Sequence, residues 1–185
     1  MIIAIFGVVC VGKSTIGKLI ADELLYEFYD LDMEMKRFYN DTILNIQRGC
    51  FGDAYDSKKA LVLKDILSKC GKDTVIAISP IYYTIKYKKL FRDYNVLSIV
   101  LQDWPENIAL RMTETDDNDE YIERRNINIK EDIKAVKYFI SRYKKAFERI
   151  ELKYDINGKS AEESAQEIVK TMICPRISQT YTPPQ

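Results

Sequence analysis

The sequence predicts one α/β domain, built on a parallel sheet with helices on both of its faces. Short apolar runs that suit strands alternate with longer segments that carry apolar residues at helical spacing. The apolar runs are largely continuous, as in strands that are buried on both faces of a sheet. The chain has 185 residues, of which 46% are hydrophobic and 30% charged, which is ordinary for one globular domain.

Five runs suit the strands of such a sheet. The first, Ile2–Phe6, is continuously apolar, and Thr74–Ser79 and Val96–Leu101 have the same character. Glu27–Asp30 is a short second strand, and Leu152–Ile156 is the weakest of the five. We expect these segments to pair in parallel, because a helix-length segment separates each from the next.

The segments between and after these strands suit helices. Ser14 to about Leu25 has apolar residues at helical spacing, and Pro105 suits the first turn of the helix that it opens. The expected helices cover residues 14–25, 33–39, 42–47, 56–70, 83–92, 105–112, 130–148 and 161–172. The predicted domain spans residues 1–174, and residues 175–185, which include Pro183-Pro184, are expected to form a flexible tail.

Composition excludes several classes of protein. Lys plus Arg and Asp plus Glu both number 28, so the chain as a whole is not attracted to nucleic acid or to an anionic membrane. No apolar run approaches the ~20 residues that span a bilayer, and the apolar N-terminus lacks a basic leader, so we interpret it as a strand and not a signal peptide. Without histidine, Ser-His-Asp and Cys-His catalysis are excluded.

The cysteines indicate the compartment. Four are present, and none forms a CxxC pair or has metal-ligand spacing. We interpret them as thiols in a reducing compartment and expect a cytoplasmic protein, either a monomer or a weak homodimer.

A phosphate-binding loop is the strongest motif. Residues 7–14, Gly-Val-Val-Cys-Val-Gly-Lys-Ser, fit G-x-x-x-x-G-K-[ST] completely and lie between an apolar strand and an amphipathic helix. The glycines let the backbone fold around phosphate, with N–H groups pointing inward at the positive end of the helix. Lys13 can reach the β- and γ-phosphates of ATP, and the Ser14 hydroxyl can bind Mg²⁺. The expected nucleotide contacts are Gly7, Val9, Cys10, Val11, Gly12, Lys13, Ser14 and Thr15.

Two carboxylates follow the second strand. Asp30 and Asp32 are two residues apart, so in an extended segment both point to the same face. At the carboxyl edge of the sheet, where ligands of open α/β sheets bind, one can hold Mg²⁺ and the other can orient and deprotonate an acceptor hydroxyl. The alternative is a solvated turn in which Asp32 is the N-cap of helix 33–39.

With these residues in place, the chain resembles the shikimate kinase family of P-loop small-molecule kinases, whose fold is that of nucleoside monophosphate kinases. The resemblance rests on residues 12–17, Gly-Lys-Ser-Thr-Ile-Gly, and 28–32, Phe-Tyr-Asp-Leu-Asp. It implies a three-layer P-loop NTPase sandwich with strand order 2-3-1-4-5. It also implies transfer of the γ-phosphate of Mg·ATP to a hydroxyl group of a small molecule.

The resemblance also implies roles for individual residues. Lys13 would contact the phosphates, Ser14 and Asp30 would bind magnesium, and Asp32 would contact the acceptor hydroxyl. Arg111 would lie against the adenine, and either Arg124 or Arg125 would be the lid arginine that meets the transferring phosphate. The acceptor would be bound by Asp32, Ser79, Pro80, Ile81 and Arg142.

The chain departs from the family pattern around the acceptor. Phe51 is followed by Gly52 where the family has Phe-Arg, and the third strand ends Ile78-Ser79-Pro80-Ile81 in place of three glycines. Arg142 is one residue out of register with the family's late arginine. We therefore expect shikimate itself to be a poor substrate, unless basic residues such as Lys36 or Arg37 replace the missing contacts. Tyr82, Tyr83 and Tyr87 either shape a different pocket or are half-buried helix residues.

Residues 113–126 are polar and acidic, and we expect them to be a lid that closes over ATP. The alternative is a surface loop whose arginines pair with Asp or Glu. A GTPase switch is disfavoured because the chain lacks Asn-Lys-x-Asp. The open alternatives are a nucleoside or nucleotide kinase and a homologue that binds ATP without catalysis.

Overall fold

The computed structural model describes residues 1–50, 53–71, 73–82, 85–124 and 127–180. Its main sheet has five parallel strands in the order β2-β3-β1-β4-β7, with β1 in the centre. The strands are β1 (Ile2–Phe6), β2 (Glu27–Asp30), β3 (Thr74–Ala77), β4 (Val96–Gln102) and β7 (Leu152–Asp155). The predicted fold class and strand order are confirmed, because β7 is the fifth strand of this sheet.

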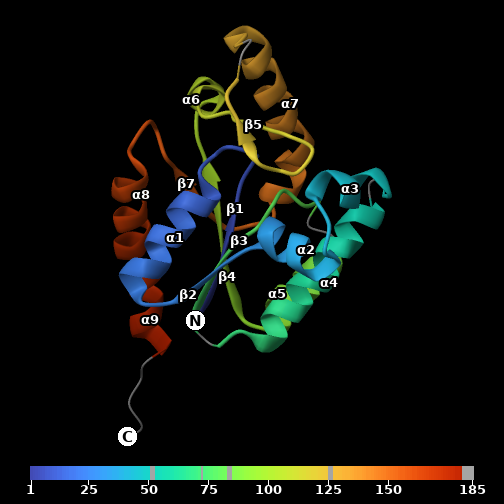
Figure 1. The fold of residues 1–185 in the computed structure, drawn as a ribbon. Helices are drawn as coiled ribbons and strands as arrows, with labels where there is room; N and C mark the ends of the chain where they lie inside the picture. Colours follow the sequence, from blue (N-terminus) through green and yellow to red (C-terminus); the bar gives the residue numbers. More distant parts are fainter. Residues whose placement is uncertain (51–52, 72, 83–84, 125–126, 181–185) are drawn as a thin grey trace, which may run out of the picture.

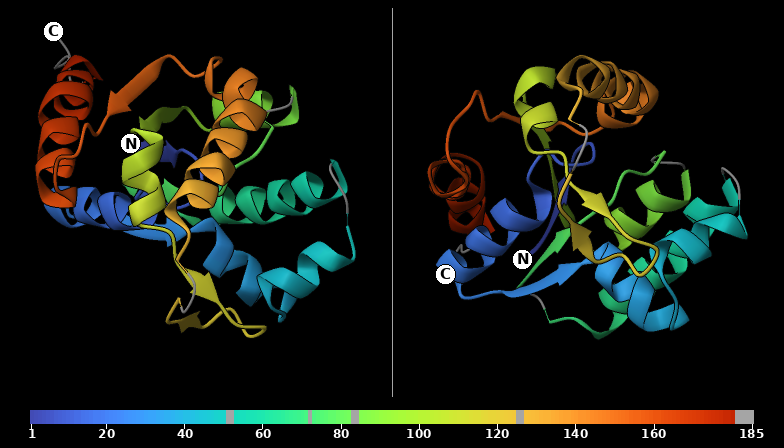
Figure 2. Two further views of the ribbon diagram at one scale, coloured as in Figure 1. Left: turned by 90° about the horizontal axis from the view of Figure 1, so that it is seen from above. Right: turned by 45° about the horizontal axis from the view of Figure 1, so that its top comes forward.

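Helices cover both faces of the sheet, as Figures 1 and 2 show. One face is covered by α1 and α8, and the other by α4 and α5, with α7 packed beside α6. The helices are α1 (Lys13–Leu24), α2 (Leu31–Tyr39), α3 (Ile43–Arg48), α4 (Asp53–Lys69), α5 (Ile85–Asp93), α6 (Pro105–Leu110), α7 (Ile129–Phe147) and α8 (Ala161–Ile168). No helix in the described ranges is both long and apolar enough to span a bilayer.

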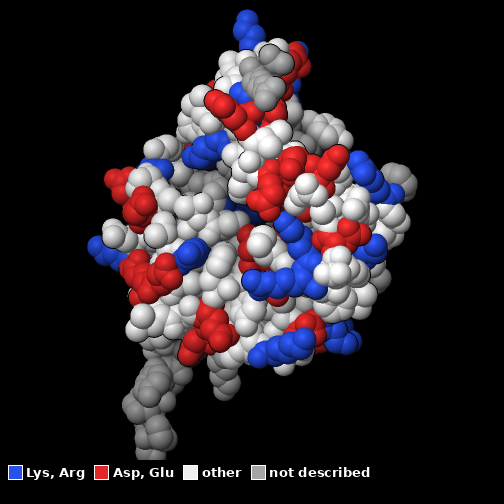
Figure 3. All heavy atoms as spheres, in the orientation of Figure 1, with Lys and Arg blue, Asp and Glu red and all other residues white. Residues whose placement is uncertain are grey.

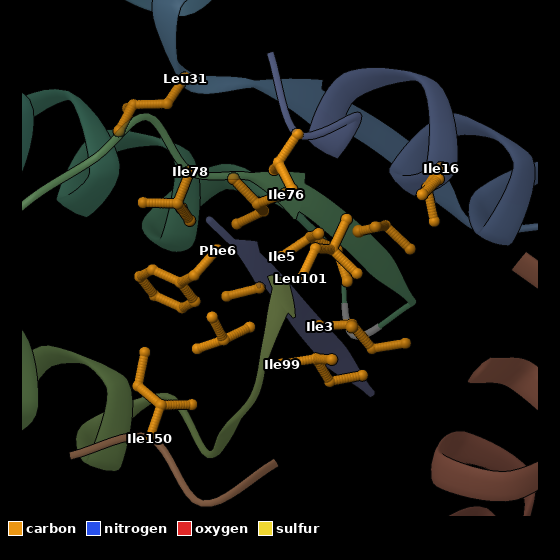
Figure 4. Packing of buried hydrophobic residues seen from close by; sticks show 14 of the residues in the cluster. Ile3, Ile5, Phe6, Ile16, Leu31, Ile76, Ile78, Ile99, Leu101 and Ile150 are labelled. Carbon is orange, nitrogen blue, oxygen red and sulfur yellow. The ribbon is translucent and has the colours of Figure 1, made fainter. Parts of the chain in front are cut away.

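The core lies on both sides of β1, whose five residues are all buried. Ile5 faces α1, where a Cβ on Gly17 would lie 3.8 Å from the Ile5 side chain. Phe6 faces the opposite way and packs edge-on against Phe91 of α5, with 5.6 Å between ring centroids. Figure 4 shows the aliphatic residues of β3 and β4 packed around these side chains. This two-sided burial explains the continuous apolar runs in the sequence.

The register brings the carboxyl ends of the inner strands together. Ile5 is paired with Ala77 of β3, and Phe6 with Val100 of β4. β3 ends at Ala77, two residues earlier than expected, although the Ile78 N–H still donates to the Ile5 carbonyl. The segment after Ile78 leaves the sheet, so its backbone needs other hydrogen-bond partners.

Three other expectations need correction. Helix α2 begins at Leu31, and its N-cap is Asp30 and not Asp32, because the Asp30 carboxylate accepts from the N–H groups of Asp32 and Met33. The acidic segment contains a hairpin of β5 (Glu114–Thr115) and β6 (Tyr121–Ile122). The expected tail is helical as far as Thr180, because the π-helical turn η1 (Val169–Ile173) continues directly into α9 (Cys174–Thr180).

Candidate active site

The phosphate-binding loop joins the central strand to α1, and two glycines permit its shape. Gly7 and Gly12 have φ angles of 151° and 110°, which side chains disfavour. A Cβ on Gly7 would lie 2.6 Å from Val11 Cγ1 and 2.9 Å from the Leu101 carbonyl oxygen. Gly12 is the N-cap of α1 and has no side chain to cap it. The first N–H groups of α1 therefore face the loop, as a phosphate site requires.

The other loop residues differ in what they can offer a nucleotide. The Val11 side chain is buried in the core, whereas Val9 is about half exposed and Thr15 is exposed. Cys10 is partly buried and has a φ of 61°. If these residues contact a nucleotide as predicted, they would do so through backbone N–H groups and, at Thr15, through an accessible hydroxyl.

Lys13 lies inside the loop. Its Nζ donates to the Val8 carbonyl oxygen over 2.8 Å. Burial lowers the pKa of Lys13, and the negative charges of Asp32 and Asp30 act against this effect. The two carboxylates and the ammonium therefore share one electrostatic environment at the edge of the sheet.

Ser14 and Asp30 form a direct pair. Ser14 Oγ donates to Asp30 Oδ2 over 2.5 Å, while Asp30 Oδ1 caps α2. Asp30 is fixed by the helix that it begins, so its second oxygen stays beside the phosphate-binding loop. A hydroxyl and one carboxylate suit Mg²⁺, which takes one or two protein oxygens and fills its shell with water and phosphate. In the part of the chain that the structure describes, no group of three or more Asp, Glu, Cys or His residues forms a self-sufficient metal site.

Asp32 lies one residue into α2 and is partly exposed. Burial raises the pKa of Asp32, and the neighbouring Asp30 adds to this, while Lys59, Ser79 and Lys13 oppose it. A carboxylate with a raised pKa is better suited to accept a proton. Ser79 Oγ is close enough to favour the charged form, yet it is buried and makes no hydrogen bond of normal geometry. Asp32 thus keeps a partly exposed carboxylate beside the buried Ser79 hydroxyl.

Two buried charged residues of α4 hold the segment after β3. Lys59 Nζ donates to the Pro80 carbonyl oxygen over 2.7 Å and lies 4.3 Å from the centre of the Tyr55 ring. Asp56 Oδ2 accepts from the Tyr82 N–H over 2.9 Å. Lys59 is 4% exposed and Asp56 6%, so both charged side chains are buried. They provide hydrogen-bond partners for the backbone of residues 80–82, which has none in the sheet. Neither residue was identified from the sequence.

A signal for these residues was nevertheless present. On α4 the buried positions include Val62, Leu63, Ile66 and Leu67. Asp56 and Lys59 continue the same face at helical spacing. Charged residues in register with an apolar stripe indicate buried, partnered charges, but their partners cannot be named until the helix is placed in space.

The tyrosines near this segment have separate roles. Tyr87 is 1% exposed and donates its hydroxyl to the Asp56 carbonyl oxygen, so it belongs to the core and not to a pocket. Tyr82 is partly exposed, and its hydroxyl accepts from Arg142 Nε over 2.6 Å. Arg142 also donates to the Tyr138 hydroxyl over 3.2 Å. Arg142 therefore reaches the predicted acceptor side, but two tyrosines hold it there. Tyr83 lies outside the described residues.

The predicted nucleotide-side arginine lies next to the phosphate-binding loop. Arg111 follows α6, and its Nη2 is 2.6 Å from Asp103 Oδ2, a carboxylate whose side chain is fully buried. Arg111 Nε also donates to the Cys10 carbonyl oxygen over 3.4 Å. These contacts fix the guanidinium beside the phosphate-binding loop.

Arg124, one of the two candidates for the lid arginine, is paired with acidic residues, as the alternative interpretation of a surface loop expects. Arg124 is 3.3 Å from Glu114 across the hairpin and 2.8 Å from Asp132 of α7. Arg124 therefore joins the base of the hairpin to α7. Arg125, the other candidate, lies outside the described residues.

Comparison with known proteins gives a consistent result. The family model described as shikimate kinase matches residues 9–173. A curated relative, a shikimate kinase of Alkaliphilus oremlandii (strain OhILAs), is 41% identical over 73 residues, which are 40% of this chain and 43% of that protein. The match thus spans less than half the length of this relative.

Solved structures match over nearly the full chain. A shikimate kinase from Aquifex aeolicus has a TM-score of 0.71 at 21% identity and covers 96% of this chain and 99% of its own. A gluconokinase from Sinorhizobium meliloti has a TM-score of 0.64 at 15% identity, with 97% of each chain covered. At such identities the likeness establishes the fold, which these two enzymes share.

The α4 contacts lead to a stability prediction. Replacing Asp56 by Ala leaves the Tyr82 N–H without its partner and removes a charge that faces Lys59. We expect the free energy of unfolding to fall by about 1–3 kcal/mol, the usual cost of an unsatisfied buried polar group. Urea denaturation would measure this, with Asp53→Ala, an exposed position on the same helix, as the control. Equal stability of the two variants would contradict the assignment.

Proposed function

This chain belongs to the shikimate kinase family, and we propose that it transfers the γ-phosphate of Mg·ATP to a hydroxyl of a small molecule. Family membership supports this class of enzyme. The observation that carries the proposal is the convergence of Lys13, Ser14, Asp30 and Asp32 at one edge of the sheet. Retention and convergence of all four also argue against a homologue that binds ATP without catalysis.

Each residue has a place in this reaction. The loop N–H groups and Lys13 would bind the phosphates, and Ser14 with Asp30 would hold Mg²⁺, which neutralises charge on the phosphates when bound. Asp32 would orient the acceptor hydroxyl and accept its proton. Arg111 would lie against the adenine. For Arg124 to meet the transferring phosphate, it must exchange its present partners, Glu114 and Asp132.

The compartment and the competing kinase class are part of the proposal. The four cysteines are free thiols, which supports the expected reducing, cytoplasmic location. A nucleoside or nucleotide kinase remains the second candidate, because it would use the same loop and carboxylates. The acceptor distinguishes the two.

Lys13 tests the transfer reaction itself. Replacing Lys13 by Ala removes the positive charge that would meet the β- and γ-phosphates. We expect turnover to fall at least ~100-fold, the scale of losing one preorganised contact to the transition state. Unchanged ATP consumption by a folded Lys13→Ala protein would refute the assignment of the loop.

Changing Asp30 or Asp32 to Asn should reduce activity for a different reason in each case. For Asp30→Asn, raised Mg²⁺ should restore part of the activity, because the defect is in metal affinity. For Asp32→Asn, added Mg²⁺ should not help, because the alignment and the proton acceptor of the acceptor hydroxyl are lost. Activity measured over a range of Mg²⁺ concentrations would separate the two, and identical responses would show that the roles are wrongly divided.

The charges around the acceptor site argue against shikimate as a good substrate. Lys36 is 3.6 Å from Asp119 of the lid, and Arg37 is paired with Glu34 and largely exposed, so both predicted replacements are engaged elsewhere. Arg142 is held by Tyr82 and Tyr138. Two lysines, Lys59 and Lys13, act on the Asp32 carboxylate. Lys13 belongs to the phosphate-binding loop, and the Lys59 ammonium already donates to the Pro80 carbonyl oxygen.

A screen of acceptors tests this expectation. ATP consumption should be measured with shikimate, other polyols, sugar acids and nucleoside monophosphates. We expect shikimate to show a KM raised by roughly tenfold or more per lost contact, from the ~1.5–3 kcal/mol of a charge-assisted hydrogen bond. Efficient phosphorylation of shikimate at micromolar KM, lost in Lys59→Met, would instead show that Lys59 supplies the carboxylate contact.

A further inference from the structure

The acidic tip of the lid is bound to the opposite side of the active site. Asp119, between β5 and β6, accepts a hydrogen bond from the Ile43 N–H at the start of α3, over 2.6 Å. The same oxygen, Oδ2, lies 3.6 Å from Lys36 Nζ of α2. The Asp119 side chain is 15% exposed, so this is a largely buried contact between segments 76 residues apart.

The tip has a defined shape that presents Asp119 outward. Asp116 Oδ1 accepts from the N–H groups of Asn118 and Glu120, over 2.8 and 2.9 Å. The Asp119 N–H donates to the Asp116 carbonyl oxygen over 3.0 Å, and Asp119 adopts the left-handed conformation, with φ 61°. The hydrogen bonds from Glu120 and Asn118 to the carboxylate lower the pKa of Asp116. The turn is therefore held by its own hydrogen bonds as well as by α2 and α3, and such internal order reduces the entropy cost of docking.

The helix that receives the tip also carries the proposed catalytic carboxylate. Lys36 is four residues after Asp32 on α2, so the two side chains lie on the same face of the helix. A contact that moves Lys36 or the connection between α2 and α3 therefore also moves α2, the helix that positions Asp32.

The other end of the lid is fixed on the nucleotide side. Arg111, two residues before the segment 113–126, contacts the Cys10 carbonyl of the phosphate-binding loop. Figure 2 shows the hairpin, in yellow, reaching from the end of α6 toward α2 and α3. Figure 3 shows a group of acidic side chains directly above a group of basic side chains, near the middle of the visible face. The lid thus forms a strap between the nucleotide side and the acceptor side.

We propose that Asp119 is a positioning residue that latches the lid to α2 and α3, coupling the lid to the helix that bears Asp32 and slowing exchange of Mg·ATP. The inference rests on the proposed function, since the exchanged ligand is the nucleotide. An unlatched lid opens more readily, because opening no longer breaks a charge-assisted hydrogen bond. The latch requires no bound ligand, since it is formed by residues of the chain alone.

Nucleotide exchange and amide exchange test the latch together. The full chain would be mixed with Mg²⁺ and a methylanthraniloyl derivative of ATP, and the dissociation rate would be measured by stopped-flow fluorescence. In Asp119→Ala we expect dissociation to be faster by about tenfold or more, the scale of one charge-assisted hydrogen bond. The Ile43 amide of the nucleotide-free protein should also exchange its hydrogen faster, because it loses its acceptor.

Matched variants separate the latch from a general effect of lid charge. Asp117→Ala removes a neighbouring carboxylate that is 88% exposed and lies 3.9 Å from Arg48, and it should change both rates less than twofold. Lys36→Met should give an intermediate effect in the wild-type background and none when Asp119 is already Ala, since the two residues share one contact.

Each outcome decides the proposal. Faster Ile43 exchange with unchanged nucleotide release would show a contact that does not control the nucleotide, and would overturn the coupling. Equal rates in Asp119→Ala and Asp117→Ala would overturn the latch itself while leaving the proposed function intact. Failure of the wild-type protein to bind the ATP derivative would overturn both.

Discussion

The close approach at Gly7 is the constraint on which the site depends. A Cβ there would collide with Val11 and with the Leu101 carbonyl, so only glycine lets the chain turn this tightly as it leaves the central strand. The turn places the N-terminus of α1 over the carboxyl edge of the sheet and brings Ser14 beside Asp30. Because β1 is central and fully buried, the loop begins from the middle of the core.

Asp30 links local structure to the proposed chemistry. One of its oxygens caps α2 and the other accepts from Ser14, so a single side chain sets both the start of the helix and the contact with the phosphate-binding loop. This arrangement also determines where Asp32 lies, because Asp32 is in the first turn of the helix that Asp30 caps. The two carboxylates look equivalent in the sequence, but helix capping gives them different surroundings and, under the proposed function, different work.

Local patterns could be predicted from the sequence, and long-range contacts could not. The apolar runs and the loop motif led to the parallel sheet and to Lys13 and Ser14, because these depend on residues close together in the chain. The strand order needed the family resemblance. Asp56 and Lys59 were missed because their partners, Tyr82 and Pro80, lie more than 20 residues away. The start of α2 was misplaced because both Asp30 and Asp32 are good N-caps, and tertiary placement decided between them.

The acidic charge of the predicted lid can be explained only from its three-dimensional contacts. A run of carboxylates beside a triphosphate would repel it, which weighs against the predicted closure of this segment over ATP. In the structure Asp116 is occupied by backbone N–H groups within the turn, and Asp119 is neutralised by Lys36 and the start of α3. Glu114 is paired with Arg124 at the base of the hairpin. These carboxylates each have a partner within the protein, so much of the lid's negative charge is directed toward the protein itself and not toward the phosphates.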